Sequence, residues 1–113
     1  MDRQGRATAE ARAVLERVAR RRSAITYSEL VDKIHAIHLE PDSKLLAQIL
    51  DEISTKSHGE RDCMLSAVVI HKDSDDLPGP GFFSLAEALG RNPSDKVAFH
   101  AAEIHRVHKS FGL

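Results

Sequence analysis

Residues 75–85, DDLPGPGFFSL, contain the strongest break in the chain, because two prolines and two glycines occupy four consecutive positions before Phe82 and Phe83. Glycine tolerates positive φ angles and proline restricts φ, so this run predicts a turn. The preceding segment, CMLSAVVIH at 63–71, is rich in β-branched residues and lies between polar clusters, which predicts a strand. We therefore expect a β-hairpin over residues 63–85 with the proline–glycine run at its tip.

The chain before this hairpin has three segments with helical spacing of apolar residues. The first covers residues 8–22. In the second, Thr26 and Glu29 form a capping box, which predicts that a helix begins at Tyr27. The third, SKLLAQILDEISTK, covers residues 43–56 and is predicted to bury its leucines and isoleucines.

The chain after the hairpin carries two further helix signals. Ser84 and Glu87 form another capping box, which predicts a short helical turn that stops at Gly90. An Asn-Pro pair followed by apolar residues at helical spacing predicts a C-terminal helix over residues 93–111. The expected fold class is α+β and mostly helical.

Composition places the chain among soluble globular proteins. It has 113 residues, of which 42% are hydrophobic and 29% charged, and this length suits a single domain over residues 1–113. The single cysteine fits a reducing compartment, and no apolar run approaches the roughly 20 residues of a membrane span. We expect a cytoplasmic protein that does not contact a membrane.

The order helix, short extended piece, helix, helix, strand, turn and strand resembles a winged helix–turn–helix domain. The resemblance covers residues 8–85, with the hairpin 63–85 as the wing and residues 93–111 as an added helix. It implies a three-helix core and, by the usual function of this fold, binding to DNA.

The segment ITYSEL at 25–30 also resembles the TYGEL entry to the DNA-binding domain of O6-alkylguanine-DNA alkyltransferases and alkyltransferase-like proteins. In that family a Pro-Cys-His-Arg segment precedes the wing, and Cys63 stands in a comparable place. Here the surrounding residues are RDCMLSAVV, without the histidine that activates the thiol. The sequence therefore predicts a structural Cys63 and no catalytic constellation.

Histidines and aspartates raise the question of a metal site. The pairs His35/His38 and His105/His108 each have i, i+3 spacing but match no recognised zinc pattern. The aspartates of DSDDLPGPG do not have the ligand spacing of a calcium loop. The sequence predicts neither a bound metal nor another cofactor.

Charge is distributed unevenly along the chain. Residues 1–22 contain seven arginines and three acids, a net charge of +4, while the remaining residues carry −5. Because phosphate neutralisation drives much of DNA binding, the first hypothesis is a small DNA-binding regulator or accessory factor. Its candidate phosphate contacts are Arg17, Arg20, Arg21, Arg22, Lys44 and Lys72.

The second hypothesis is a protein-interaction module, such as a dimeric scaffold or an immunity or antitoxin-type inhibitor. Successive strand residues point to opposite faces, so one of two adjacent strand phenylalanines would be exposed. Exposed aromatic residues are enriched at interfaces. The candidate contacts to a protein partner or a second copy of the chain are Phe82, Phe83, Asp73, Asp75 and Asp76.

Overall fold

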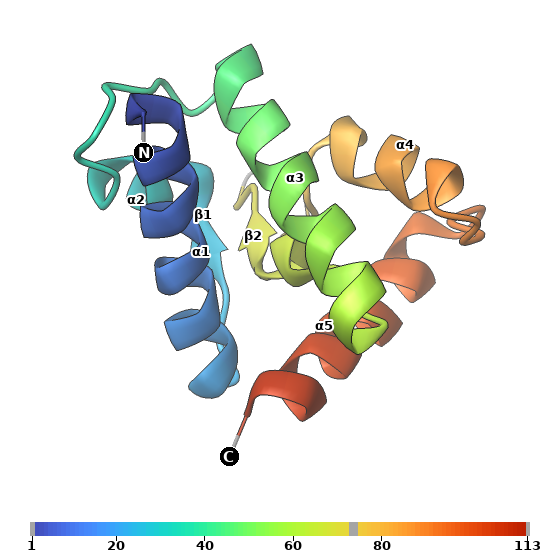
Figure 1. Cartoon of the computed structure of the whole chain (residues 1–113). Coiled ribbons are helices and arrows are strands. Elements are labelled where there is room, and N and C mark those ends of the chain that lie inside the picture. The colour runs from blue at the N-terminus through green and yellow to red at the C-terminus, as the bar shows by residue number, and fades with distance from the viewer. Residues whose placement is uncertain (1, 73–74, 113) are drawn as a thin grey trace.

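The computed structural model describes residues 2–72 and 75–112, and Figure 1 shows a mostly helical molecule with one very small sheet. This confirms the α+β, mostly helical class. The elements in chain order are α1 (Arg3–Arg20), β1 (Ile25–Thr26), α2 (Tyr27–Asp32), α3 (Lys44–Arg61), the 3₁₀ helix η1 (Leu65–Val68), β2 (Val69–Ile70), α4 (Pro80–Ala88) and α5 (Lys96–Phe111).

The centre of the core is η1, which packs against α1, α3 and α5. All four of its residues are buried. Ser57 Oγ accepts from the Leu65 amide at 2.9 Å, and Ser54 Oγ accepts from the Ser66 amide at 2.9 Å. Two backbone donors that a strand would pair with its neighbour are thus satisfied by serines of α3.

The predicted strand over residues 63–71 is therefore wrong except at its end. Only Val69 and Ile70 form β2, which pairs in parallel with Ile25 and Thr26 of β1. The apolar run that suggested a strand is buried among three helices instead of lying on a sheet. A short apolar run has the same pattern in both environments, so periodicity does not separate them.

The predicted hairpin over residues 63–85 is also wrong. One antiparallel bridge, between His71 and Leu77, brings the chain back on itself. The segment after it forms α4, with Gly79 as N-cap and Pro80 in the first turn. Proline suits this position because its missing N–H would have no intrahelical partner. Accordingly, the predicted capping box at Ser84 does not form, since Ser84 lies inside α4.

Both phenylalanines of this segment face the core. Phe82 is 6% exposed and Phe83 is 5% exposed, and their rings meet edge to face with centroids 5.2 Å apart. In a strand the two side chains would point apart, whereas in α4 they share a buried side with Ala86. The predicted exposed phenylalanine is therefore wrong.

The helix α2 begins as predicted. Thr26 Oγ1 accepts from the Glu29 amide at 3.1 Å, and the Glu29 carboxylate accepts from the Thr26 amide at 3.0 Å. The bond from the Thr26 amide, together with one from the Thr26 hydroxyl at 3.0 Å, lowers the pKa of the Glu29 carboxyl group. The helix ends at Asp32, and the carboxylate of Glu10 on α1 then accepts from the amides of His35 and Ala36.

Replacing Thr26 with alanine is expected to lower the free energy of unfolding by about 0.5–2 kcal/mol, because the Glu29 amide loses its acceptor. Urea denaturation followed by circular dichroism measures the change. Thr55→Ala is the control, since the exposed Thr55 hydroxyl donates only to the Asp51 carbonyl in α3. Equal effects of the two substitutions would contradict the stabilising role of the capping box.

The structure contains both predicted terminal helices, but each begins at a different residue from the predicted one. Helix α1 begins at Arg3 after the N-cap Asp2, not at residue 8. Helix α5 begins at Lys96 after the N-cap Asp95, three residues after the predicted start. The α5 side chains that are buried are His100, Glu103, Val107 and Phe111.

A buried carboxylate fixes α5 to the core. Glu103 is 0% exposed, and one of its carboxylate oxygens accepts from the Met64 amide at 2.7 Å. Arg91, from the loop between α4 and α5, donates to the same carboxylate at 2.5 and 3.3 Å. Glu103 therefore accepts the hydrogen bond of the Met64 amide just before η1 and, through Arg91, holds the loop between α4 and α5 against the core.

Candidate functional site

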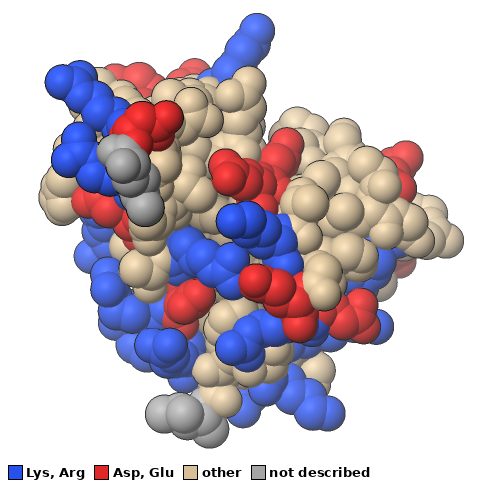
Figure 2. Space-filling model, viewed as in Figure 1, with Lys and Arg blue, Asp and Glu red and all other residues tan. Residues whose placement is uncertain are grey.

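Four arginines are grouped where α1 ends, and we call the surface they form the basic end. Arg17 and Arg20 lie in the last turn of α1, Arg21 is its C-cap and Arg22 adopts a positive φ of 54°. All four side chains are exposed. Figure 2, viewed as Figure 1, shows blue atoms gathered at the lower left, where α1 ends.

The C-terminus of α5 lies against the basic end. His108 Nε2 donates to the Ser23 carbonyl at 2.8 Å. A Cβ on Gly112 would lie only 3.2 Å from Arg22 Nε, so the guanidinium is close to the backbone there. Exposed Lys109 stands in the last turn of α5 and adds a cation near these arginines.

Within the described ranges of the chain, the arginines of the basic end have no acidic partner. Among the ion pairs of residues 2–72 and 75–112, none includes Arg17, Arg20, Arg21 or Arg22. The nearest acid along α1, Glu16, pairs with Arg12 at 3.1 Å. Their charge is thus available to an external anion.

Two further arginines lie near the end of α5 and were missed from the sequence. Arg61 donates to the Ser110 carbonyl at 3.0 Å, and its guanidinium lies 4.2 Å from the centroid of the Phe111 ring. Arg106 pairs with Asp62 at 3.2 Å. Arg61 and Arg106 are 45 residues apart in the sequence, so no short-range pattern groups them.

The two predicted lysine contacts lie elsewhere. Lys44 is the first residue of α3, which has 18 residues and is about 27 Å long. Figure 1 places that end of α3 opposite the end of α1. Lys72 lines a surface depression with Thr26 and Tyr27. The structure therefore groups four of the six predicted phosphate contacts and separates two.

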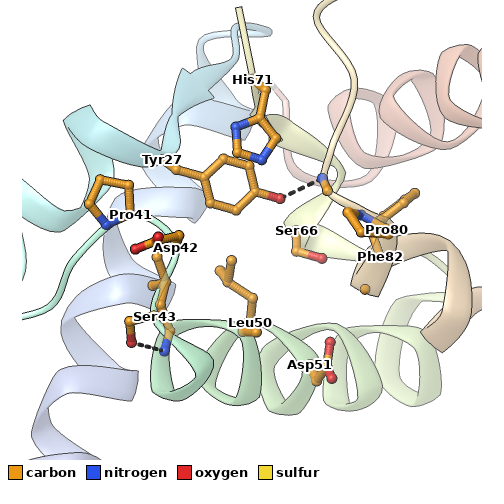
Figure 3. Close-up of a pocket in the computed structure, with 14 residues that line it drawn as sticks. Tyr27, Pro41, Asp42, Ser43, Leu50, Asp51, Ser66, His71, Pro80 and Phe82 are labelled. Carbon is orange, nitrogen blue, oxygen red and sulfur yellow. Dashed lines mark hydrogen bonds between the residues drawn. The ribbon is translucent and has the colours of Figure 1, made fainter. Parts of the chain in front are cut away.

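The proline–glycine run lines a cavity instead of forming a wing tip. The cavity has a volume of about 310 Å³ and lies between α2, α3 and the start of α4. Gly79, Pro80 and Phe82 contribute to its wall, and Leu50 and Asp51 of α3 lie across from Tyr27 (Figure 3).

Tyr27 fixes the geometry of this cavity. Its hydroxyl oxygen accepts from the Gly79 amide at 2.9 Å, which holds the N-terminus of α4. Its ring stacks on His71, with centroids 4.1 Å apart and planes inclined by 16°. Burial raises the pKa of the Tyr27 hydroxyl. At neutral pH the residue is thus a neutral phenol.

The predicted acidic protein contact is only partly described. Asp75 and Asp76 are exposed, and both have a φ of 57°. Aspartate tolerates this left-handed conformation better than most residues. Asp73 lies outside the described residues. With Phe82 and Phe83 buried, the exposed members of the predicted contact among the described residues are Asp75 and Asp76.

Cys63 is buried directly after α3, at 1% exposure, and not on a strand. Burial raises the pKa of its thiol, which keeps the thiolate scarce. This environment does not provide the activation that a nucleophilic cysteine needs.

Within residues 2–72 and 75–112, no three His, Cys, Asp or Glu side chains are grouped so that they could hold a metal ion. No helix in this part of the chain is both long and apolar enough to cross a membrane. No protein-family model matches the chain, and comparison with curated proteins and with solved structures gives no significant match.

Proposed function

We propose that this chain is a non-catalytic DNA-binding accessory module whose basic end contacts the phosphate backbone. The observation that carries the proposal is the set of four exposed arginines at positions 17–22 that lack acidic partners in the described part of the chain. Guanidinium groups match phosphate oxygens with paired N–H donors, and this geometry favours arginine at such contacts.

The rest of the surface supports a contact restricted to this end. Residues 23–113 carry a net charge of −5, so the remaining faces are on average repelled by a polyanion. On α3, which would be the recognition helix of a winged helix, Glu52 and Glu60 are exposed. A major-groove position for α3 would bring these acids near phosphates.

The element order α1, β1, α2, α3, β2 supports a winged-helix relationship in which the His71–Leu77 bridge replaces a full hairpin. The proposed orientation nevertheless differs from the usual one, because the basic end is on α1 and α5. Contacts of this kind position a protein on DNA without reading bases. We therefore expect weak dependence on DNA sequence.

The proposal predicts salt-dependent binding to a generic DNA duplex. If about four phosphates are neutralised, the association constant is expected to fall by roughly 10²-fold between about 50 and 200 mM salt. Fluorescence anisotropy of a labelled duplex at several salt concentrations measures this fall. Absence of binding at 50 mM salt, or binding that does not change with salt, would contradict the proposed function.

A further inference from the structure

A second site is independent of the basic end. We propose that the cavity between Tyr27 and α3 binds a small organic cation with a compact apolar body, and that the carboxylate of Asp51 accepts the hydrogen bonds of its cationic group. The proposed ligand class follows from the size, apolar walls and charge of the cavity.

The walls of the cavity fit an apolar body. The side chains of Leu46, Leu50 and Phe82 line it, and prolines at positions 41 and 80 contribute further apolar surface. Its volume of about 310 Å³ lies at the lower end of the range of small-molecule sites. A single saturated or aromatic ring with a short substituent is the size of ligand that this space favours.

The charge of the lining selects a cation. Asp42 and Asp51 line the cavity, and in the part of the chain that the structure describes no lysine or arginine does. Asp51 is partly buried, and within residues 2–72 and 75–112 its carboxylate has neither a hydrogen bond nor an ion pair. A desolvated carboxylate without a partner is unfavourable, so a bound cation would stabilise it.

Tyr27 provides a second attraction for positive charge. His71 stacks on its ring, while Leu50 and Asp51 lie across the cavity from it (Figure 3). A cation near a tyrosine ring is attracted by the negative potential of its face. An ammonium group between Asp51 and Tyr27 would therefore contact both its counter-ion and an aromatic ring.

Tyr27 also supplies the measurement, because the chain has one tyrosine and no tryptophan. We would titrate the protein with cyclohexylmethylammonium and follow tyrosine fluorescence, since this probe does not absorb where tyrosine does. Its neutral analogue is cyclohexylmethanol, and its anionic analogue is cyclohexanecarboxylate. The ammonium is expected to bind at least about 10-fold more tightly than the alcohol, as for a hydrogen bond to a charged group. The carboxylate is expected not to bind.

Asp51→Asn is expected to weaken ammonium binding by about 10-fold and to abolish the preference over the alcohol. Glu52→Gln is the matched control, because it removes the same charge from the next residue, which lines a different depression. The control is expected to bind the ammonium like the unchanged protein. Equal binding of ammonium and alcohol, an unaffected Asp51→Asn, or unchanged fluorescence at about 10 mM ammonium would overturn the assignment.

The pH dependence provides a further readout. Burial raises the pKa of Asp51, so its carboxylate takes up a proton at a higher pH than an ordinary aspartate does. As the pH falls, ammonium binding is therefore expected to start weakening at a higher pH than it would with an ordinary aspartate. The other titratable groups that face this carboxylate across the cavity are Tyr27, His71 and Asp42. His71→Gln is the control for the imidazole that stacks on Tyr27. If Asp51→Asn left this pH dependence unchanged, Asp51 would not be the acceptor.

Discussion

Replacing Arg20, Arg21 and Arg22 together with alanine is expected to remove most of the affinity for a DNA duplex. Each lost phosphate contact reduces the slope of log association constant against log salt by about one. The triple variant should therefore lose a slope of about three and bind too weakly to measure at about 200 mM salt. All three side chains are exposed, so the fold should be preserved.

The matched control is a triple alanine variant at Arg3, Arg6 and Lys44. It removes the same charge from exposed residues at the opposite end of α1 and at the start of α3. A general effect of net charge would lower the DNA affinity of both variants equally, whereas a contact at the basic end lowers only the affinity of the first variant. Equal losses would contradict the assignment of the arginines as phosphate contacts.

Replacing Glu103 with alanine is expected to lower the free energy of unfolding by about 3–5 kcal/mol. The substitution removes the acceptor for the Met64 amide and leaves the guanidinium of Arg91 without its counter-ion. The cavity left beneath α5 adds to the loss. For a domain of this size such a change can prevent folding at 37 °C. Urea denaturation at low temperature measures it.

A double variant separates charge from packing. Glu103→Leu with Arg91→Met removes both ions and retains much of the side-chain volume, so it should recover at least about 1 kcal/mol relative to Glu103→Leu alone. Arg91→Ala alone leaves Glu103 buried without its cation and should also be destabilising. If all single substitutions cost less than about 1 kcal/mol, the buried pair would not hold the core together as described.

The sequence allowed local features to be predicted where one residue pattern has one physical meaning. The capping box of Thr26 and Glu29 is such a case, since both hydrogen bonds are formed within four residues. Gly90 ends the fourth helix with a positive φ of 84°, as a glycine after a helix commonly does. The third helix was found because its leucines and isoleucines repeat with a clear helical period.

The sequence was insufficient where tertiary contacts decide the conformation. The run before β2 becomes a 3₁₀ helix because serines of α3 accept hydrogen bonds from its amides, and these serines are 8 and 12 residues away. Pro80 was interpreted as a turn residue, although proline is equally suited to the first turn of a helix. Because Pro80 was assigned to a turn, Phe82 and Phe83 were predicted to lie on a strand, although they lie on the buried side of α4.

The candidate sites show the same division. The arginines of the basic end are adjacent in the sequence and were predicted together. Lys109 comes near these arginines only in the folded chain, because it lies on α5. The cavity likewise depends on segments that are 24 or more residues apart in the sequence, around Tyr27, Asp51 and Gly79. No short-range pattern contains that information.

The measurement that tests the central claim most directly is a titration of the ¹⁵N-labelled protein with a short DNA duplex, followed by amide chemical shifts. The proposed contact predicts that the first and largest shifts occur at residues 20–24 and 109–112, while amides near Gln48 and Glu52 on α3 remain unchanged. Largest shifts along the exposed side of α3, or no shifts at about 50 mM salt, would contradict the basic end as the DNA contact.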